Sequence, residues 1–152
     1  MPDPIAFDST SPRFALPLLF AGQAQKEAFV NEAHALTDAL LHCAIEGESA
    51  TPPTTPVEGT NWLVASSPTG AWAGQTGKIA CRQAGNWLFV TPRDGMTLLN
   101  RTNGQQRRYF VSWLAPSVPT VPSGGSTVDA EARAAINALV AALRTAGVFP
   151  AS

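Results

Sequence analysis

Five short apolar runs decide the fold that the sequence predicts: NWLVAS (61–66), GKIACR (77–82), NWLFVT (86–91), MTLLNR (96–101) and RYFVSWL (108–114). Each run has the length of a strand, and most are rich in β-branched or aromatic residues. Turn signals such as Asp94-Gly95 and Asn103-Gly104 separate them. We therefore expect a small antiparallel β meander or barrel over residues 57–114.

All 4 tryptophans fall inside this β domain, at Trp62, Trp72, Trp87 and Trp113. A core this small needs the large area that each indole buries, which favours a core position for all of them. Trp72 is the one alternative, because Gly70 and Gly74 place it in a loop. An exposed indole there would stack on a sugar ring, so Trp72 is the candidate glycan contact.

A long helix is predicted before the strands, over residues 23–47, where good helix formers run without a proline and Gly47 supplies a stop. Its apolar residues step by four and three: Phe29, Ala33, Leu36, Leu40 and Cys43. Such a stripe fits a coiled-coil seam with a partner and equally an amphipathic helix lying on its own β core. We expect the opposite face, which carries Lys26, Glu27, Asn31, His34 and Asp38, to be solvated.

Both flanking segments are predicted to be extended. Residues 1–22 hold Pro2, Pro4, Pro12 and Pro17, and this predicts an apolar arm lying on a surface of its own chain or of another. Residues 115–127 form a Pro/Gly/Ser linker.

A second helix is predicted over residues 128–147. Its apolar stripe is Ala132, Ile136, Leu139, Leu143 and Ala146. A tethered helix of this length gains stability by packing against copies of itself or a partner. The predicted class is α+β, with a long N-terminal helix, a small antiparallel β meander or barrel and a C-terminal amphipathic helix for oligomerisation. The candidate oligomer interface comprises Phe29, Leu36, Leu40, Ala132, Ile136, Leu139 and Leu143.

The composition argues against several classes of function. Charged residues make up 14% of the 152 and the net charge is −1, which leaves little attraction for nucleic acid or an anionic membrane. No apolar run reaches the roughly 20 residues of a membrane helix, and no signal peptide is recognisable. We therefore expect synthesis in the cytoplasm, with no nucleic-acid or membrane partner.

No pattern of reactive side chains indicates catalysis. His34 and His42 lie about 12 Å apart along one helix, too far to share a metal. Cys43 and Cys81 have no metal-binding spacing and are expected to be free thiols. Nucleophile elbows, phosphate-binding loops and zinc-protease motifs are missing from the sequence. We expect no enzyme activity, no catalytic residue, no cofactor and no metal.

Several motifs resemble a phage-related family long catalogued as a domain of unknown function. They are Phe14-Ala15-Leu16-Pro17, Ala21-Gly22-Gln23-Ala24-Gln25-Lys26-Glu27, Asn31-Glu32-Ala33, Pro56-Val57-Glu58-Gly59-Thr60, Gly70-Ala71-Trp72-Ala73-Gly74 and Thr91-Pro92-Arg93-Asp94-Gly95. The resemblance covers about residues 12–100. It implies a component of tailed phages or gene transfer agents, in head spikes or tail fibres. After Arg101 the sequence departs from the family pattern, so the resemblance does not extend to a receptor-binding segment.

The resulting expectation is a virion protein: a head spike or fibre base that attaches to the particle and supports adsorption to the host surface. Its expected partners are copies of itself, as a trimer or pentamer, capsid or other virion proteins, and a spike or fibre protein. The alternative is a glycan-binding adhesin module that recognises host capsule sugars through exposed tryptophans.

Overall fold

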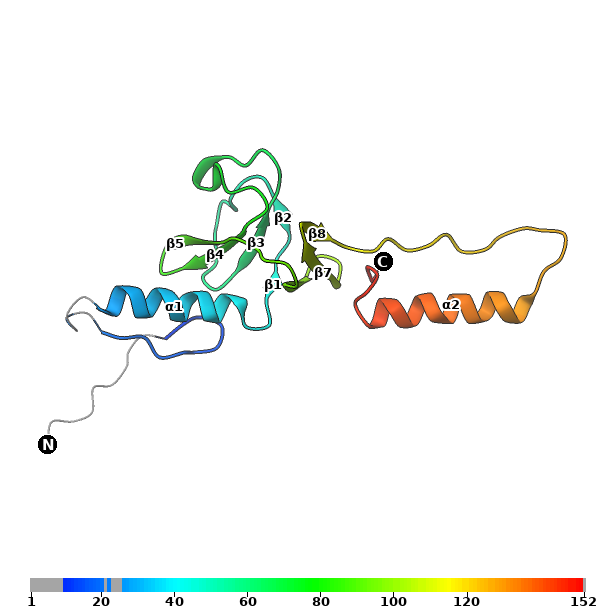
Figure 1. Cartoon of the computed structure of the whole chain (residues 1–152), viewed down its shortest axis with the longest axis horizontal. Helices are drawn as coiled ribbons and strands as arrows, with labels where there is room; N and C mark the ends of the chain where they lie inside the picture. The colour runs from blue at the N-terminus through cyan, green and yellow to red at the C-terminus, as the bar shows by residue number, and fades with distance from the viewer. Residues whose placement is uncertain (1–9, 21, 23–25, 152) are drawn as a thin grey trace, which may run out of the picture. The chain divides into compact units, whose positions relative to one another are not determined.

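The computed structural model describes residues 10–20, 22 and 26–151. The first half of the chain holds α1 (Lys26–Leu40), β1 (Ala44–Ile45), β2 (Glu48–Ser49), β3 (Asn61–Val64), η1 (Gly70–Trp72), β4 (Ile79–Gln83) and β5 (Asn86–Val90). The second holds β6 (Thr97–Asn100), β7 (Gln105–Phe110), β8 (Ser112–Leu114) and α2 (Ala130–Thr145) (Figure 1). The chain divides into two compact units, Met1–Pro92 and Arg93–Ser152.

The predicted long N-terminal helix is wrong. The strands of the described residues form two sheets, with one short helix toward each end of the chain. α1 ends at Leu40, and His42 adopts a φ of 49°, a left-handed value that stops the helix. Cys43 and Ile45 then continue as extended chain and are buried there. Their apolar character fits a strand as well as a helix, which is why spacing extended the helix too far.

In the first unit, β3, β4 and β5 form an antiparallel meander, and β2, which was not expected as a strand, is added beside β3. The sheet has the order β2-β3-β4-β5, and β2 runs parallel to β3 with Glu48 opposite Leu63. β3, β4 and β5 are antiparallel, with Trp62 opposite Ala80 and Ala80 opposite Phe89. The parallel pair forms because the proline-rich segment between β2 and β3 crosses over instead of turning back directly.

The two faces of this sheet bury different residues. Leu63, Ile79 and Cys81 lie on the face toward α1, which packs against β4 with Ala35 and Ala39. The other face carries a second cluster of Val64, Ala80 and Trp72, with Trp62, Trp87 and Phe89 partly buried against it. The short η1 turn places Trp72 over this face.

The second unit contains an antiparallel meander of β6, β7 and β8. Leu98 of β6 lies opposite Arg107 of β7, and Tyr109 lies opposite Trp113 of β8. The β6–β7 turn depends on Asn100, whose side chain accepts from the backbone N–H of Thr102 at 3.0 Å. The expectation of one meander over residues 57–114 is therefore wrong, because the antiparallel strands are divided between the two units.

Candidate functional site

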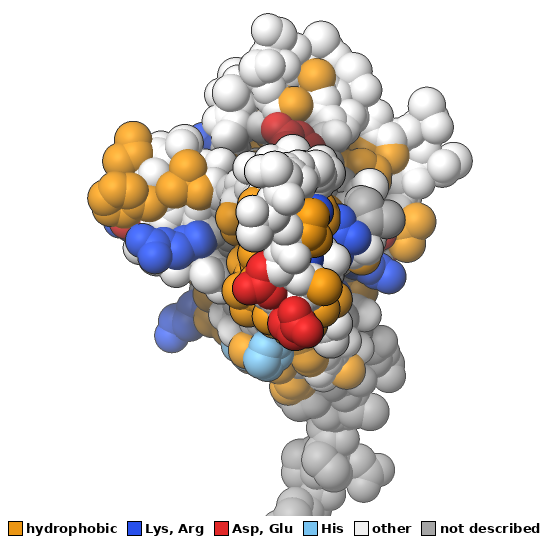
Figure 2. All heavy atoms as spheres, turned by 90° about the vertical axis from the view of Figure 1, so that its right-hand side faces the viewer, with side chains coloured by type: hydrophobic (Ala, Val, Ile, Leu, Met, Phe, Trp, Pro, Cys, Tyr) orange, Lys and Arg blue, Asp and Glu red, His pale blue; other side chains and the backbone are white. Residues whose placement is uncertain are grey.

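The most exposed apolar element of the described chain is α2. Asp129 caps it by accepting from the backbone N–H of Ala132 at 2.8 Å, and the helix contains no buried residue. Of its predicted stripe, Ala132, Ile136, Leu139 and Ala146 are exposed and Leu143 is half-buried. Leu139 alone leaves 60% of its surface open. Figure 2 shows hydrophobic side chains open to solvent beside acidic ones.

The chain after α2 is anchored, in contrast to the helix itself. The backbone N–H of Gln106 donates to the carbonyl of Gly147 at 2.7 Å. The backbone N–H of Ala151 donates to the backbone carbonyl of Asn103 at 2.8 Å. The buried Gln105 side chain donates to the carbonyls of Pro116 and Val148. The end of the chain is thus fastened to the β6–β7 turn and β7, which fixes one end of α2 without covering its apolar stripe.

In α1, the predicted interface residues do not share one environment. Phe29 is 80% exposed, whereas Leu36 and Leu40 are half-buried. The buried face consists of Ala35, Asp38 and Ala39 and lies against the sheet of the same unit. Of the two alternatives that the spacing left open, packing on its own core accounts for this buried face, and Phe29 lies outside it.

Asp38 and Asn31, expected on a solvated face, make structural contacts, so that expectation is wrong. The fully buried carboxylate of Asp38 accepts from the backbone N–H groups of Arg13 and Phe14, at 3.0 and 2.7 Å. The Asn31 side chain pairs with both backbone groups of Leu19. The described part of the predicted arm is therefore bound to α1 of its own chain.

Arg13 completes this attachment at the C-terminal end of α1. Its guanidinium donates to the carbonyls of Asp38, Ala39, Leu41 and His42, at 2.6 to 3.2 Å. The last carbonyls of a helix have no partner within the helix, and a cation there is also favoured by the helix dipole. Sequence reasoning missed this role. An aspartate among the apolar residues Ala35, Ala39 and Leu40 was the signal that the helix needed a polar partner.

Trp72 does not fit the role of glycan contact. It is fully buried, its ring lies 6.4 Å from that of Trp62, and it makes an edge-to-face contact with Trp87 at 5.1 Å. No face of its indole is open to a sugar. The flanking glycines form the turn that places the ring in the core.

The two cysteines are buried and free. Burial raises the pKa of the Cys43 thiol to about 11, although the nearby Arg13 guanidinium acts in the opposite direction. Burial, reinforced by Cys43, raises the pKa of Cys81 to about 12. Both groups are therefore protonated at neutral pH, and a protonated thiol is a poor nucleophile and metal ligand.

The described residues contain no group of three or more His, Cys, Asp or Glu side chains placed to hold a metal ion. Within the same part of the chain, none of the helices is both long and apolar enough to cross a membrane.

Residues 30–113 match the sequence model of a family described as a protein of unknown function, DUF2793. The chain belongs to this family. The matched region begins in α1 and ends in β8, so both sheets lie in it and α2 lies outside it. No curated protein matches the chain.

Proposed function

We propose that this protein is a structural component of a phage or phage-like gene transfer agent, a head spike or fibre base that attaches to the particle. The motif resemblance over about residues 12–100 is the support for the particle context. The description of the DUF2793 family states no function and adds nothing to it. In this proposal the protein is made in the bacterial cytoplasm and resides in the virion. It performs no catalytic step.

The exposed apolar stripe of α2 is the observation that carries the assembly role. A helix of 16 residues with no buried side chain gains little from its own chain, and isolated helices of this length are marginal in water. Bundling of copies through Ala132, Ile136, Leu139 and Leu143 would bury the stripe. A closed ring of three or five copies suits a fibre or a fivefold vertex, respectively.

In this proposal the first unit is the part of the protein that attaches to the particle. Its arm, α1 and sheet are joined by buried and partly buried hydrogen bonds, so they form a stable block. Phe29 is the largest exposed apolar side chain of α1 and is the residue that we assign to contact a capsid or other virion protein.

The assembly role is tested by the mass of the full-length protein in solution. Ile136→Gln together with Leu139→Gln removes the stripe and preserves the anchored residues 147–151, which a deletion of residues 123–152 would also remove. Ala134→Gln is the matched control, because residue 134 is exposed on the opposite side of α2. We expect a trimer or pentamer for the control and a monomer for the double variant. An unchanged oligomer in the double variant would refute bundling by α2.

The particle context is tested independently. Purified particles from a producing strain should contain the protein in a fixed ratio to the capsid protein, and genes for capsid, portal and tail proteins should neighbour its gene. Particles without the protein, produced by a strain that expresses it, would contradict the proposed location.

A further inference from the structure

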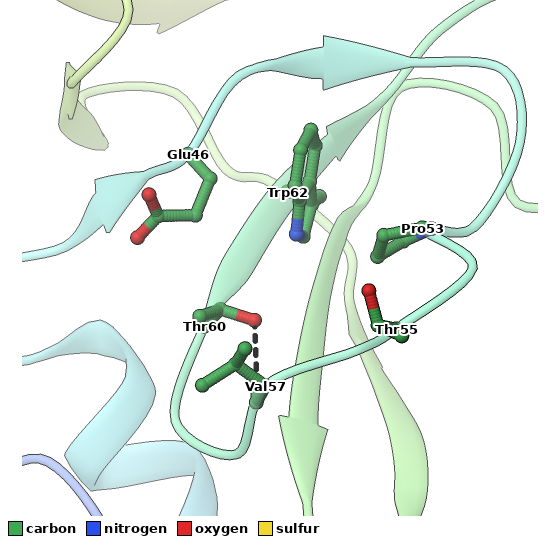
Figure 3. A pocket seen from close by; sticks show the side chains of 6 residues that line it. All are labelled: Glu46, Pro53, Thr55, Val57, Thr60 and Trp62. Carbon is green, nitrogen blue, oxygen red and sulfur yellow. Dashed lines mark hydrogen bonds between the residues drawn. The ribbon is translucent and has the colours of Figure 1, made fainter.

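A pocket of about 450 Å³ lies beside β3 in the first unit. Its lining residues are Glu46, Pro53, Thr55, Val57, Thr60 and Trp62 (Figure 3). The volume lies within the range of small-molecule sites, roughly 300–1,000 Å³. Its lining shares no residue with the apolar stripe of α2, and neither the motif resemblance nor the family match assigns the pocket a ligand.

Trp62 forms one wall of the pocket, and a second, buried indole supports its ring. Its ring packs on the fully buried Trp72, which in turn makes an edge-to-face contact with Trp87. Trp62 itself is only half-buried, so part of its surface remains available. A ligand that contacts this indole does not have to immobilise it, which lowers the entropic cost of binding.

The opposite wall is a proline-rich strap, residues 51–57, and it is fixed at both ends. The backbone N–H of Thr51 donates to the Ser49 hydroxyl at 3.1 Å. At the other end, the N–H of Gly59 donates to the carbonyl of Arg82 at 2.9 Å. Pro52, Pro53 and Pro56 restrict the backbone between these anchors. The pocket is therefore largely formed before a ligand enters.

Neutral polar groups converge on an otherwise apolar space. Figure 3 shows the indole nitrogen of Trp62 and the hydroxyls of Thr55 and Thr60 directed into the pocket, while the Glu46 carboxylate lies at its edge and points away from Trp62. The Thr60 hydroxyl donates to the carbonyl of Val57 at 2.7 Å, so its oxygen is left as an acceptor. No lysine or arginine lines the pocket.

This chemistry matches a sugar more closely than other small ligands. A pyranose ring has an apolar C–H face that packs on an indole, and hydroxyls that both donate and accept. An anionic ligand would find no cation and a carboxylate at the edge. A proline side chain would pack on the indole but leave the three polar groups unused.

We propose that the pocket between Trp62 and the 51–57 strap binds a neutral pyranose sugar. The binding residue is thus Trp62 and not the buried Trp72. The site is independent of the assembly role, and the residues that test the two do not overlap.

The test uses the indole N–H signals in nitrogen-edited NMR spectra of the full-length chain, which contains 4 tryptophans. The probes are the methyl glycosides of glucose, galactose, mannose and N-acetylglucosamine. At least one of them should shift the Trp62 signal saturably and leave the Trp113 signal in place. Glucuronic acid and a triproline peptide serve as the anionic and proline probes.

Trp62→Phe removes the indole N–H and keeps an aromatic wall, and it should weaken binding about tenfold, as expected for the loss of one hydrogen bond. Trp113→Phe makes the same chemical change outside the pocket and should leave the affinity unchanged. Thr55→Val, an exposed isosteric change, should also weaken binding and guards against misfolding of the Trp62 variant. The proposal is overturned if no glycoside shifts Trp62, if both phenylalanine variants bind equally well, or if only triproline or glucuronic acid binds.

Discussion

The helices α1 and α2 have similar lengths and a similar spacing of apolar residues, but their surroundings differ. They contain 15 and 16 residues, and each carries apolar side chains at steps of three and four without a proline. Yet Ala35, Asp38 and Ala39 of α1 are buried, and no residue of α2 is. An apolar stripe therefore does not by itself determine whether a helix packs on its own chain.

Polar partners account for the difference. Asp38 and Asn31 of α1 bind the backbone of the arm, Gln83 reaches Asp38, and Arg13 closes the C-terminal end. The side-chain contacts of α2 lie near its ends, where Asp129 caps the first turn and Arg133 reaches the carbonyl of Gly124. α1 is thus fixed along its length by its own chain, whereas α2 has its middle free for a partner.

The largest loss of stability is expected for Asp38→Ala, which removes the main polar contact between α1 and the arm. Removing the buried carboxylate leaves the N–H groups of Arg13 and Phe14 and the Gln83 amide without their acceptor, which should lower the free energy of unfolding by about 4 kcal/mol. Chemical denaturation measures the loss. Glu32→Ala on the exposed side of α1 is the control and should change stability by less than about 0.5 kcal/mol. Equal effects would mean that the arm does not depend on Asp38.

Alkaline pH should weaken only the unit that contains α1, because both cysteines are there. Burial raises the pKa of Cys43 to about 11 and that of Cys81 to about 12, so above pH 9 the unfolded chain loses thiol protons that the folded chain retains. Stability should fall by about 1.4 kcal/mol per pH unit for each thiol. Denaturation of the Cys43→Ala/Cys81→Ala variant between pH 9 and 10.5 should show a shallower slope. Parallel slopes would contradict burial of the thiols.

Strands β3 to β6 and the presence of a helix toward each end of the chain were predictable from sequence, because turn residues and hydrophobic periodicity are local signals. Strands β1 and β2 were not predicted, and the single strand expected over residues 108–114 is divided between β7 and β8. The limits of α1 were not predictable, because Cys43 and Ile45 suit a strand and a helix alike. The parallel pairing of β2 with β3 depends on the path of the 51–57 strap, which spacing does not encode. The C-terminal end of α1 and the parallel pairing of β2 with β3 are determined by contacts between segments that are distant in the sequence.

The candidate residues show the same limit. Composition indicated that tryptophans build the core, and Trp72 does so, but the sequence did not show that Trp62 keeps an accessible surface while Trp72 does not. Nor did the sequence show that the Arg13 guanidinium donates to carbonyls at the C-terminal end of α1, 25 or more residues away along the chain. The apolar stripe of α2 was visible from spacing, and its exposure sharpens the assembly proposal without testing it.

A smaller effect should follow from removing the cap of α2. Asp129→Ala leaves the N–H of Ala132 without its acceptor and should destabilise the helix by about 1 kcal/mol. Amide hydrogen exchange in the first turn of α2 should become faster, with no change in α1. Asp129→Asn, which preserves a capping oxygen, should restore most of the protection. Exchange that is unchanged in the alanine variant would show that a partner, and not the cap, holds this end.

The smallest effect is expected where the two helices differ most, at the exposed stripe of α2. In dilute protein, Leu139→Ala should change the free energy of unfolding by less than about 0.5 kcal/mol, because the side chain is 60% exposed. Leu98→Ala, at a position only 2% exposed in the same unit, should cost about 3 kcal/mol. At higher concentration the parent chain should gain thermal stability through association, and Leu139→Ala should reduce that gain. If Leu139→Ala were as costly as Leu98→Ala at the lowest concentration, α2 would pack within its own chain, and the contrast with α1 would disappear.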